Sequence, residues 1–140
     1  MSFLYEEEGC FVCGARNDEG LKIRFDRISG GTSFAKHIFE ARHQGYDGVV
    51  HGGILSAVLD DSMAYAIMAL GLIPVTTEMK VRFKKTVAVS EEIEFQGQVV
   101  KVGRRIIETS AVAKGQEGDV RVEAEGKYFV GAMRDRDFSP

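Results

Sequence analysis

The sequence predicts a single α+β domain in which a curved antiparallel sheet of about six strands wraps around one long buried helix. Two observations carry this prediction. The run Gly53–Leu70 is apolar on nearly every side, as in a helix that is buried all round. Before and after that run, apolar and polar residues alternate along the chain, which is typical of strands. With 140 residues, the chain is long enough to bury a core as one domain spanning 1–140.

The alternating segments give the order of the strands. Before the helix, strands are predicted at 21–25 and 33–39. After it, alternation predicts four more, at 77–84, 91–102, 105–113 and 120–130. Residues 1–20 are expected to form a loop or a short helical lead-in, and 133–140 a frayed tail. One helix cannot cover both faces and both edges of such a sheet, so we expect a homodimer, or a homotetramer built from dimers.

Charge and composition narrow the class of partner. The formal net charge of −3 gives no general attraction to nucleic acid or to an anionic membrane. The first residues lack the basic and apolar regions of a secretory signal. Ser56, Asp60, Asp61 and Ser62 argue against a membrane crossing by the apolar run. We therefore expect a cytoplasmic protein with neither a nucleic-acid nor a membrane partner.

His51, Gly52 and Gly53 open the predicted helix, and Asp60 interrupts its apolar surface two turns later. An ionised carboxylate away from water is costly unless it is paired or hydrogen-bonded, so an aspartate kept there is a candidate catalytic group. The alternative is a structural carboxylate in a buried network. Glycines at a helix start offer backbone N–H groups, backed by the helix dipole, that could polarise a carbonyl.

Geometry separates these two features within one chain. Gly53 and Asp60 lie roughly 10 Å apart along a helix axis, so one carbonyl cannot contact both. If both serve one reaction, Asp60 of one subunit must face the glycine turn of another. This reasoning predicts active sites at a subunit interface, two in each dimer.

Other residues near these features have both a functional and a structural interpretation. His51 could act on a substrate or cap the helix. Ser56 lies one turn before Asp60 and could line the site or satisfy a helical carbonyl. Thr77 shares the inward parity of its strand. Asp61 lies about 100° further round the helix and is expected to contact solvent or an interface.

Cys10 and Cys13 form half of a zinc-ribbon pattern, and the chain has no second cysteine pair. His37 and His43 could complete a metal site only if the fold brought them close to the cysteines. We therefore expect a tight turn with two reduced thiols and no bound metal.

Several parts of the sequence resemble one family. They are the stretch 45–61 (GYDGVVHGGILSAVLDD), the strand 75–83, the turn 101–105 and the opening stretch 10–14 (CFVCG). Together they resemble the phenylacetate-pathway branch of the 4-hydroxybenzoyl-CoA thioesterase superfamily, over nearly the whole chain except its tail. The resemblance implies the hot-dog fold and hydrolysis of an acyl-CoA thioester. Coenzyme A would be part of the substrate, and no separate cofactor is implied.

The resemblance also implies roles for single residues. Asp60 would be the catalytic carboxylate, the N–H groups of Gly52 and Gly53 would polarise the thioester carbonyl, and Thr76 would hold the attacking water. Physical reasoning from strand parity favours Thr77 instead, so both threonines are candidates.

Substrate contacts are assigned in the same way. Some members of the family carry an asparagine where this chain has Gly45, and the adjacent Gln44 is a candidate to replace its amide. The turn 103–105, with Gly103, Arg104 and Arg105, resembles the family's CoA-contacting turn, and arginine pairs well with phosphate. Lys80, Arg82 and Lys84 are by default a solvated strand face. The residues expected to line the acyl pocket are Met63, Tyr65, Ile67, Met68 and Phe83.

Two functions of different classes remain open. The first is an acyl-CoA thioesterase in which Asp60 acts as a general base or as a nucleophile. The second is a non-catalytic module that binds or senses acyl-CoA on the same fold. A desolvated carboxylate near the thioester favours the first, because a binding module gains nothing from it. A dehydratase of the same fold fits less well, since it would pair a histidine with the helix carboxylate in a different sequence context.

Overall fold

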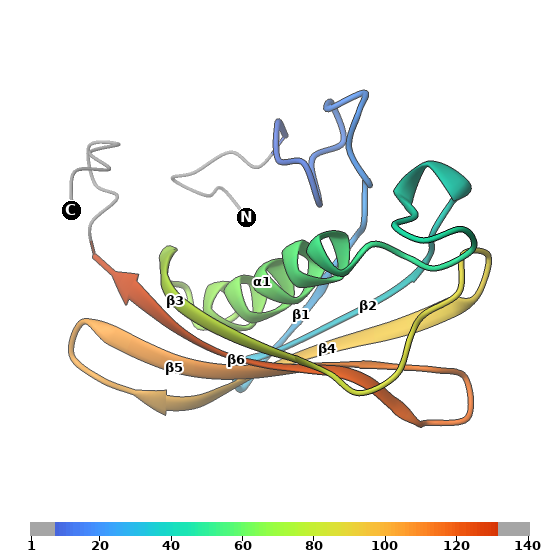
Figure 1. Ribbon diagram of the computed structural model, residues 1–140. Helices are drawn as coiled ribbons and strands as arrows, with labels where there is room; N and C mark the ends of the chain where they lie inside the picture. The colour runs from blue at the N-terminus through green and yellow to red at the C-terminus, as the bar shows by residue number, and fades with distance from the viewer. Residues whose placement is uncertain (1–7, 132–140) are drawn as a thin grey trace.

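The computed structural model describes residues 8–131, in which one helix crosses the concave face of a six-stranded antiparallel sheet (Figure 1). The elements are β1 (Asp26–Ile28), β2 (Thr32–Ile38), the short 3-10 helix η1 (Ala41–His43), α1 (Gly52–Met68), β3 (Pro74–Phe83), β4 (Glu92–Val102), β5 (Ile106–Lys114) and β6 (Val120–Val130). Across the sheet, the strands follow the order β1-β2-β4-β5-β6-β3. The predicted arrangement of six strands around one long helix is confirmed.

Helix α1 is apolar on nearly all sides because the sheet covers one side and N-terminal residues cover part of another. Its completely buried apolar side chains are Val58, Leu59, Met63, Ala66 and Ile67. His51 caps its start, since the Nδ1 atom accepts a 2.9 Å hydrogen bond from the Gly53 N–H. Among residues 8–131, no helix is long and apolar enough to cross a membrane.

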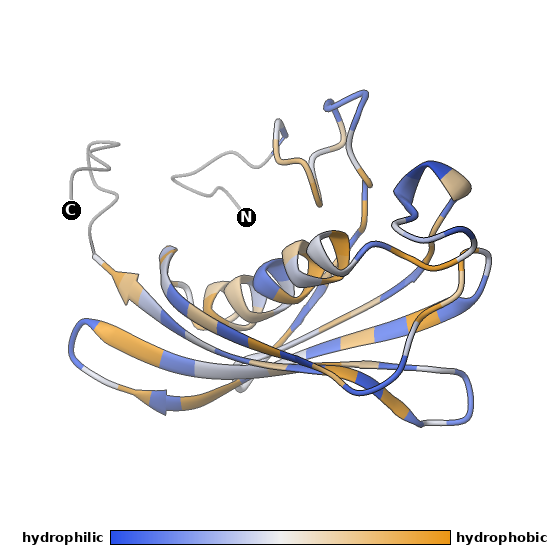
Figure 2. Ribbon diagram, in the orientation of Figure 1, coloured by the Kyte–Doolittle hydropathy of each residue, from blue (hydrophilic) through white to orange (hydrophobic). Residues whose placement is uncertain are grey.

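Gly97 of β4 lets α1 lie directly on the sheet. A Cβ atom at this position would lie 2.1 Å from the Ser62 carbonyl oxygen, so only glycine fits. The same carbonyl accepts a 2.5 Å hydrogen bond from Ser33 Oγ. Hydrophobic and hydrophilic residues alternate along the central strands (Figure 2). These contacts fix the turn of α1 that carries Asp60 and Asp61.

The strand predicted at 21–25 is wrong, although its alternation of buried and exposed residues is real. Leu21 and Ile23 are buried, but their N–H groups donate to the carbonyls of Phe11 and Val12, at 2.8 and 2.9 Å. This segment therefore pairs with the N-terminal loop instead of the sheet, and the strand that pairs with β2 is the later β1. Of the predicted lead-in, residues 8–20 form turns. Residues 1–7 and the predicted tail at 133–140 lie outside the described residues.

Strand β3 forms one edge of the sheet and pairs with β6. It begins at Pro74, three residues before the predicted start, and has a bulge between Thr76 and Glu78. Thr76 is opposite Tyr128, and Glu78 is opposite Lys127, so Thr77 is the extra residue. Because of the bulge, the residues before Glu78 point to the opposite faces from those that simple alternation predicts. The bulge therefore determines which of the two threonines faces the helix.

Candidate active site

Asp60 lies in the middle of α1, half-buried, with its carboxylate held from two neighbouring strands. Thr76 Oγ1 in β3 donates to Asp60 Oδ1 at 2.8 Å. The Tyr128 hydroxyl in β6 donates to the same oxygen at 2.8 Å and lies 3.2 Å from the Asp60 backbone oxygen. Both side-chain bonds reach Oδ1, and they fix the orientation of the carboxylate.

The bulge in β3 explains why Thr76, and not Thr77, contacts Asp60. Counting alternate residues back from the half-buried Met79 and Val81 predicts that Thr77 points inward. Because Thr77 is the extra residue of the bulge, its hydroxyl instead donates to the Lys127 carbonyl at 2.9 Å, on the exposed side. Of the two candidate threonines, Thr76 is therefore the one whose hydroxyl contacts Asp60.

Tyr128 is a site residue that reasoning from the sequence missed. Its side chain is completely buried, and a buried tyrosine hydroxyl needs a hydrogen-bond partner. Burial raises the pKa of Tyr128 well above its usual range, and the negative charge of Asp60 raises it further. The hydroxyl therefore stays protonated and remains a donor to Asp60. Its inward parity in the predicted strand 120–130 was the available signal, but nothing in the sequence indicated its partner.

The glycine turn lies at the start of α1 beside a cleft of about 600 Å³, which we call the turn cleft. Its lining residues are Gly45, Tyr46, Val49, Val50, His51, Gly52, Leu55, Phe83, Lys84, Lys85, Thr86 and Val87. A Cβ atom on Gly52 would lie 3.4 Å from the Phe83 ring, so a larger residue would crowd the cleft. The Gly53 N–H donates to His51 Nδ1, whereas the Gly52 N–H has no acceptor among residues 8–131.

A second pocket, of about 350 Å³, lies beside Asp60, and we call it the carboxylate pocket. It is lined by Gly9, Cys10, Cys13, Asp60, Asp61, Ala64, Tyr65, Met68, Pro74 and Thr76. It shares no residue with the turn cleft. Within one chain, the candidate base and the glycine turn therefore face different cavities, as the helical spacing predicted.

Other predicted site residues have structural partners in the chain. Ser56 Oγ donates to the Gly52 carbonyl at 2.9 Å and so satisfies the helix start. Gln44 Oε1 accepts from the Gly48 N–H at 2.9 Å, which closes the loop before α1, and Gln44 does not line the turn cleft. Met63 and Ile67 are completely buried in the core, and neither lines the turn cleft or the carboxylate pocket.

The turn containing Gly103, Arg104 and Arg105 joins β4 to β5 at the end of the sheet away from the start of α1 (Figure 1). A Cβ atom on Gly103 would lie 2.5 Å from the Ile106 carbonyl oxygen, so the turn requires glycine. Both arginines are exposed. In one chain, this turn reaches neither the turn cleft nor the carboxylate pocket.

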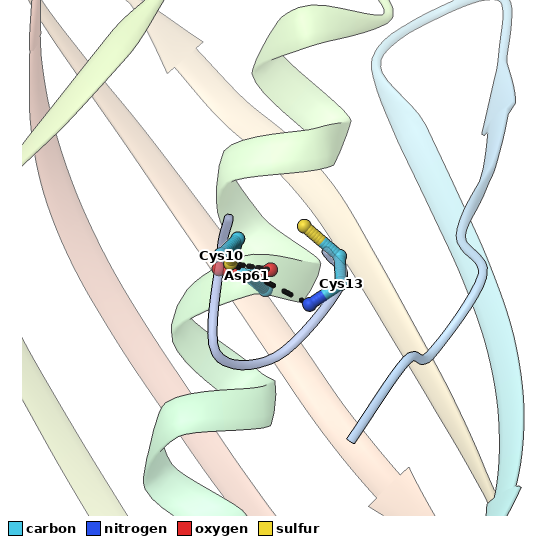
Figure 3. A group of neighbouring side chains, drawn as sticks. All are labelled: Cys10, Cys13 and Asp61. Carbon is cyan, nitrogen blue, oxygen red and sulfur yellow. Dashed lines mark hydrogen bonds between the residues drawn. The ribbon is translucent and has the colours of Figure 1, made fainter. Parts of the chain in front are cut away.

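Asp61 contacts the N-terminal loop, which corrects the expectation that it faces solvent or an interface. Its Oδ2 accepts a hydrogen bond from the Cys10 thiol, at 3.5 Å (Figure 3). Burial raises the pKa of Asp61 to about 8, with a further contribution from Cys10. The pKa of Cys10 is lowered to about 5, chiefly by a hydrogen bond from the Cys13 thiol. Cys10 and Asp61 are 51 residues apart in the chain, and nothing in the sequence indicated that the fold brings them into contact.

The two histidines considered as partners of the cysteines lie elsewhere. His43 is 7% exposed, packs edge-on against Phe39, and accepts the Glu40 N–H at its Nδ1 atom. The His37 ring also packs edge-on against Phe39, with the two ring centroids 4.8 Å apart. Neither belongs to the group formed by Cys10, Cys13 and Asp61.

Residues 47–122, more than half of the chain, match the model of the thioesterase superfamily, and the chain belongs to that family. The family resemblance and the hot-dog fold predicted from the sequence are thereby confirmed. A curated protein of Saccharolobus solfataricus, named as a candidate esterase, is 24% identical over 112 residues, covering 79% of this chain and 74% of that protein.

Solved structures show the same fold. A thioesterase superfamily protein designated RHA08564 aligns with a TM-score of 0.79 and 25% identity, over 84% of this chain, and this chain spans only 61% of that protein. A hypothetical thioesterase of Streptococcus pneumoniae, solved with coenzyme A, aligns with a TM-score of 0.74 and 22% identity, over 78% of this chain and 85% of that one. Two further structures of a thioesterase from that strain carry an alanine in place of an aspartate or a threonine.

Proposed function

We propose that the protein hydrolyses an acyl-CoA thioester and that Asp60 activates the attacking water. The observation that carries this proposal is the Asp60 carboxylate, held at Oδ1 by Thr76 and Tyr128 beside a pocket of about 350 Å³. Membership of the thioesterase superfamily supports the reaction class, and the streptococcal thioesterase solved with coenzyme A supports the substrate class. The aspartate and the threonine that were replaced by alanine in the Streptococcus pneumoniae thioesterase are 16 residues apart, which is also the spacing of Asp60 and Thr76.

The hydrogen bonds at Oδ1 suggest how the carboxylate acts. With Oδ1 engaged by two hydroxyl donors, Oδ2 is the oxygen that takes a proton from water as general base. The same oxygen could attack the thioester directly and form an anhydride. Single turnover in oxygen-18 water tests the second route, because label found in Asp60 can come only from an anhydride that water hydrolysed at the Asp60 carbonyl.

The start of α1 provides the candidate site for the developing oxyanion. The Gly52 N–H has no acceptor among residues 8–131 and lies at the positive end of the helix dipole, where a negative oxygen is stabilised. His51 Nδ1 accepts from Gly53, which leaves Nε2 as the donor atom of the neutral ring. His51 lines the turn cleft, so this donor is available to a bound acyl-CoA. No cofactor is needed besides the CoA that the substrate carries.

Strand β3 offers a way to unite the two half-sites in a dimer. At one end, Thr76 contacts Asp60, and at the other, Phe83 lies against Gly52. If the free edge of β3 pairs antiparallel with its copy, the Thr76 end of one chain lies beside the Phe83 end of the other. Asp60 of one subunit then approaches Gly52 of its partner, which completes two equivalent active sites.

The decisive experiment is thiol release from a panel of aryl, short, medium and long acyl-CoAs by the wild type and by Asp60→Asn. We expect turnover of at least one substrate, lowered by orders of magnitude in the folded variant. If acyl-CoA binds but no substrate is hydrolysed, the protein is a binding or sensing module. Full activity in Asp60→Asn would instead reject Asp60 as the catalytic carboxylate.

A mixing experiment tests the placement of the site across two subunits. Asp60→Asn and Gly52→Val are each expected to be inactive alone, but a mixed dimer retains one intact pair of Asp60 and Gly52. Unfolding and refolding an equal mixture should restore about a quarter of the wild-type activity, because about half of the dimers are mixed and each has one intact site. No recovery in demonstrably mixed dimers would place both groups in one chain's site.

A further inference from the structure

The N-terminal loop presents both cysteines from one tight turn. The Gly14 N–H donates to the Cys10 carbonyl at 2.9 Å, and the Cys13 N–H donates to Cys10 Sγ at 3.5 Å. A Cβ atom on Gly14 would lie 2.4 Å from the Glu8 carbonyl oxygen, so the turn requires glycine at this position. The turn therefore requires the glycine that follows Cys13, and it places both thiols on one loop.

The fold holds this turn against helix α1. Val12, between the two cysteines, is 4% exposed, and its carbonyl accepts the Ile23 N–H at 2.9 Å. In Figure 3, the turn crosses the helix at Asp61, with Cys10 directly over the carboxylate. The loop is thus anchored in the core by groups other than the cysteines, and the thiols are placed before any ligand binds.

Asp61 supplies a third group to the two thiols. One ligand atom from each of Cys10, Cys13 and Asp61 lies within 4.8 Å of the other two. In a tetrahedral zinc site with Zn–S bonds of about 2.3 Å, two sulfur ligands are about 3.8 Å apart. Side-chain movements of about 1 Å would therefore bring the three atoms onto one ion. The residues come from two segments, 51 positions apart, that the fold brings together.

We propose that Cys10, Cys13 and Asp61 bind one Zn²⁺ ion and thereby fasten the N-terminal loop to α1. Two thiolates and a carboxylate favour a thiophilic ion over Mg²⁺ or Ca²⁺, which prefer oxygen ligands alone. A cation also compensates three groups that would otherwise be half-buried as anions or be held protonated. Cys10 Sγ and Asp61 Oδ2 lie 3.5 Å apart and share a proton through a hydrogen bond, which a bound zinc ion would replace.

The fourth position of the ion opens onto the carboxylate pocket. That pocket is lined by the three ligands and also by Asp60 and Thr76. Asp60 Oδ1 is already engaged by Thr76 and Tyr128, so a water molecule is the natural fourth ligand. The ion would lie beside the candidate catalytic carboxylate, and its binding to Asp61 would restrain the helix turn that carries Asp60.

The chain is well suited to a direct test because it contains only two cysteines. Reduced, tag-free protein is dialysed against Zn²⁺, then against metal-free buffer, and its metal content is measured. Replacement by Co²⁺ should add a thiolate-to-cobalt charge-transfer band that can come only from Cys10 and Cys13. The variants are Cys13→Ser, Asp61→Asn and, as a matched control, Asp18→Asn, an exposed aspartate in the same N-terminal segment.

We expect one Zn²⁺ in each wild-type chain and a melting temperature that rises with Zn²⁺ and falls with chelator. Cys13→Ser should lose the charge-transfer band, and Asp61→Asn should bind Zn²⁺ at least tenfold more weakly, while Asp18→Asn behaves as the wild type. Equal affinity in Asp61→Asn would overturn the assignment of Asp61. Failure of the reduced wild type to take up Zn²⁺ or Co²⁺, or a Cys10–Cys13 disulfide as its stable form, would overturn the site. These wild-type measurements decide the matter even if a variant does not fold.

Discussion

The Thr76 hydroxyl donates a 2.8 Å hydrogen bond to Asp60 Oδ1, and this contact joins the edge strand β3 to the middle of α1. The edge strand is where a second copy of the chain would add. The candidate catalytic carboxylate is therefore oriented by a residue of the surface that the proposed dimer buries. Assembly and catalysis would then depend on the same strand, which gives the first prediction.

Thr76→Val should lower kcat about 10- to 100-fold, because Asp60 loses one of the two donors that orient it. Thr77→Val is the matched control: it removes the same hydroxyl one residue later, where the partner is the Lys127 carbonyl. We expect Thr77→Val to keep kcat within about twofold. Steady-state thiol release measures both. An equal loss of kcat in the two variants would mean that catalysis depends on the conformation of β3 and not on the hydrogen bond from Thr76 to Asp60.

Tyr128→Phe should affect both stability and turnover. The variant leaves Asp60 Oδ1 with the Thr76 bond alone and removes a hydroxyl from a completely buried site. We expect a loss of about 1–2 kcal/mol in the free energy of unfolding and a roughly tenfold lower kcat. Urea unfolding and thiol release measure the two effects. Unchanged kcat in a destabilised variant would reduce Tyr128 to a structural role.

The sequence predicted those parts of the fold and site that depend on local pattern. The all-round apolar run predicts a buried helix, and Asp60 stands out because it is polar in that run. His51 was predicted as a possible cap, and the structure shows that hydrogen bond. Alternation also located the strands after the helix, since burial on one face imposes a period of two residues.

The parts that the sequence did not predict depend on contacts between distant segments. The bulge at Thr77 changes the parity of β3, and no residue type in the segment signals it. Tyr128 and Cys10 reach the helix carboxylates only because β6 and the N-terminal loop fold against α1. Asp61 looked like a surface residue because its partner is 51 residues away in the chain.

Replacing both Arg104 and Arg105 by alanine tests the contact with the phosphates of CoA that the family resemblance implies for this turn. Both arginines are exposed in the turn between β4 and β5, so their loss should not disturb the fold. We expect KM for an acyl-CoA to rise about tenfold, with little change in kcat, because phosphate contacts bind substrate and transition state equally.

The control for the arginine pair is a substrate without the nucleotide. KM for the matching N-acetylcysteamine thioester should be the same in the double variant and the wild type. Lys36→Ala, which removes an exposed cation from β2, should leave both KM values unchanged. A rise in KM for both substrates would place the arginines near the acyl group or in the fold, and no rise for either would remove them from the binding site.

Protonation of His43 should lower the free energy of unfolding in mildly acidic solution. Burial lowers the pKa of His43 and of the neighbouring His37, and the Glu40 N–H donates to His43 Nδ1, which requires that nitrogen to be unprotonated. The unfolded chain takes up protons on these rings near pH 6.5. The histidines' contribution to stability is therefore complete above that pH, and it falls as the pH drops toward the lowered pKa values of the folded state.

The variant His43→Asn keeps an acceptor for the Glu40 N–H but does not titrate. Urea unfolding at pH 7.5 and 5.5 should show a smaller acid-induced loss in His43→Asn and in His37→Asn than in the wild type, whereas three equal losses would assign the acid sensitivity to other groups.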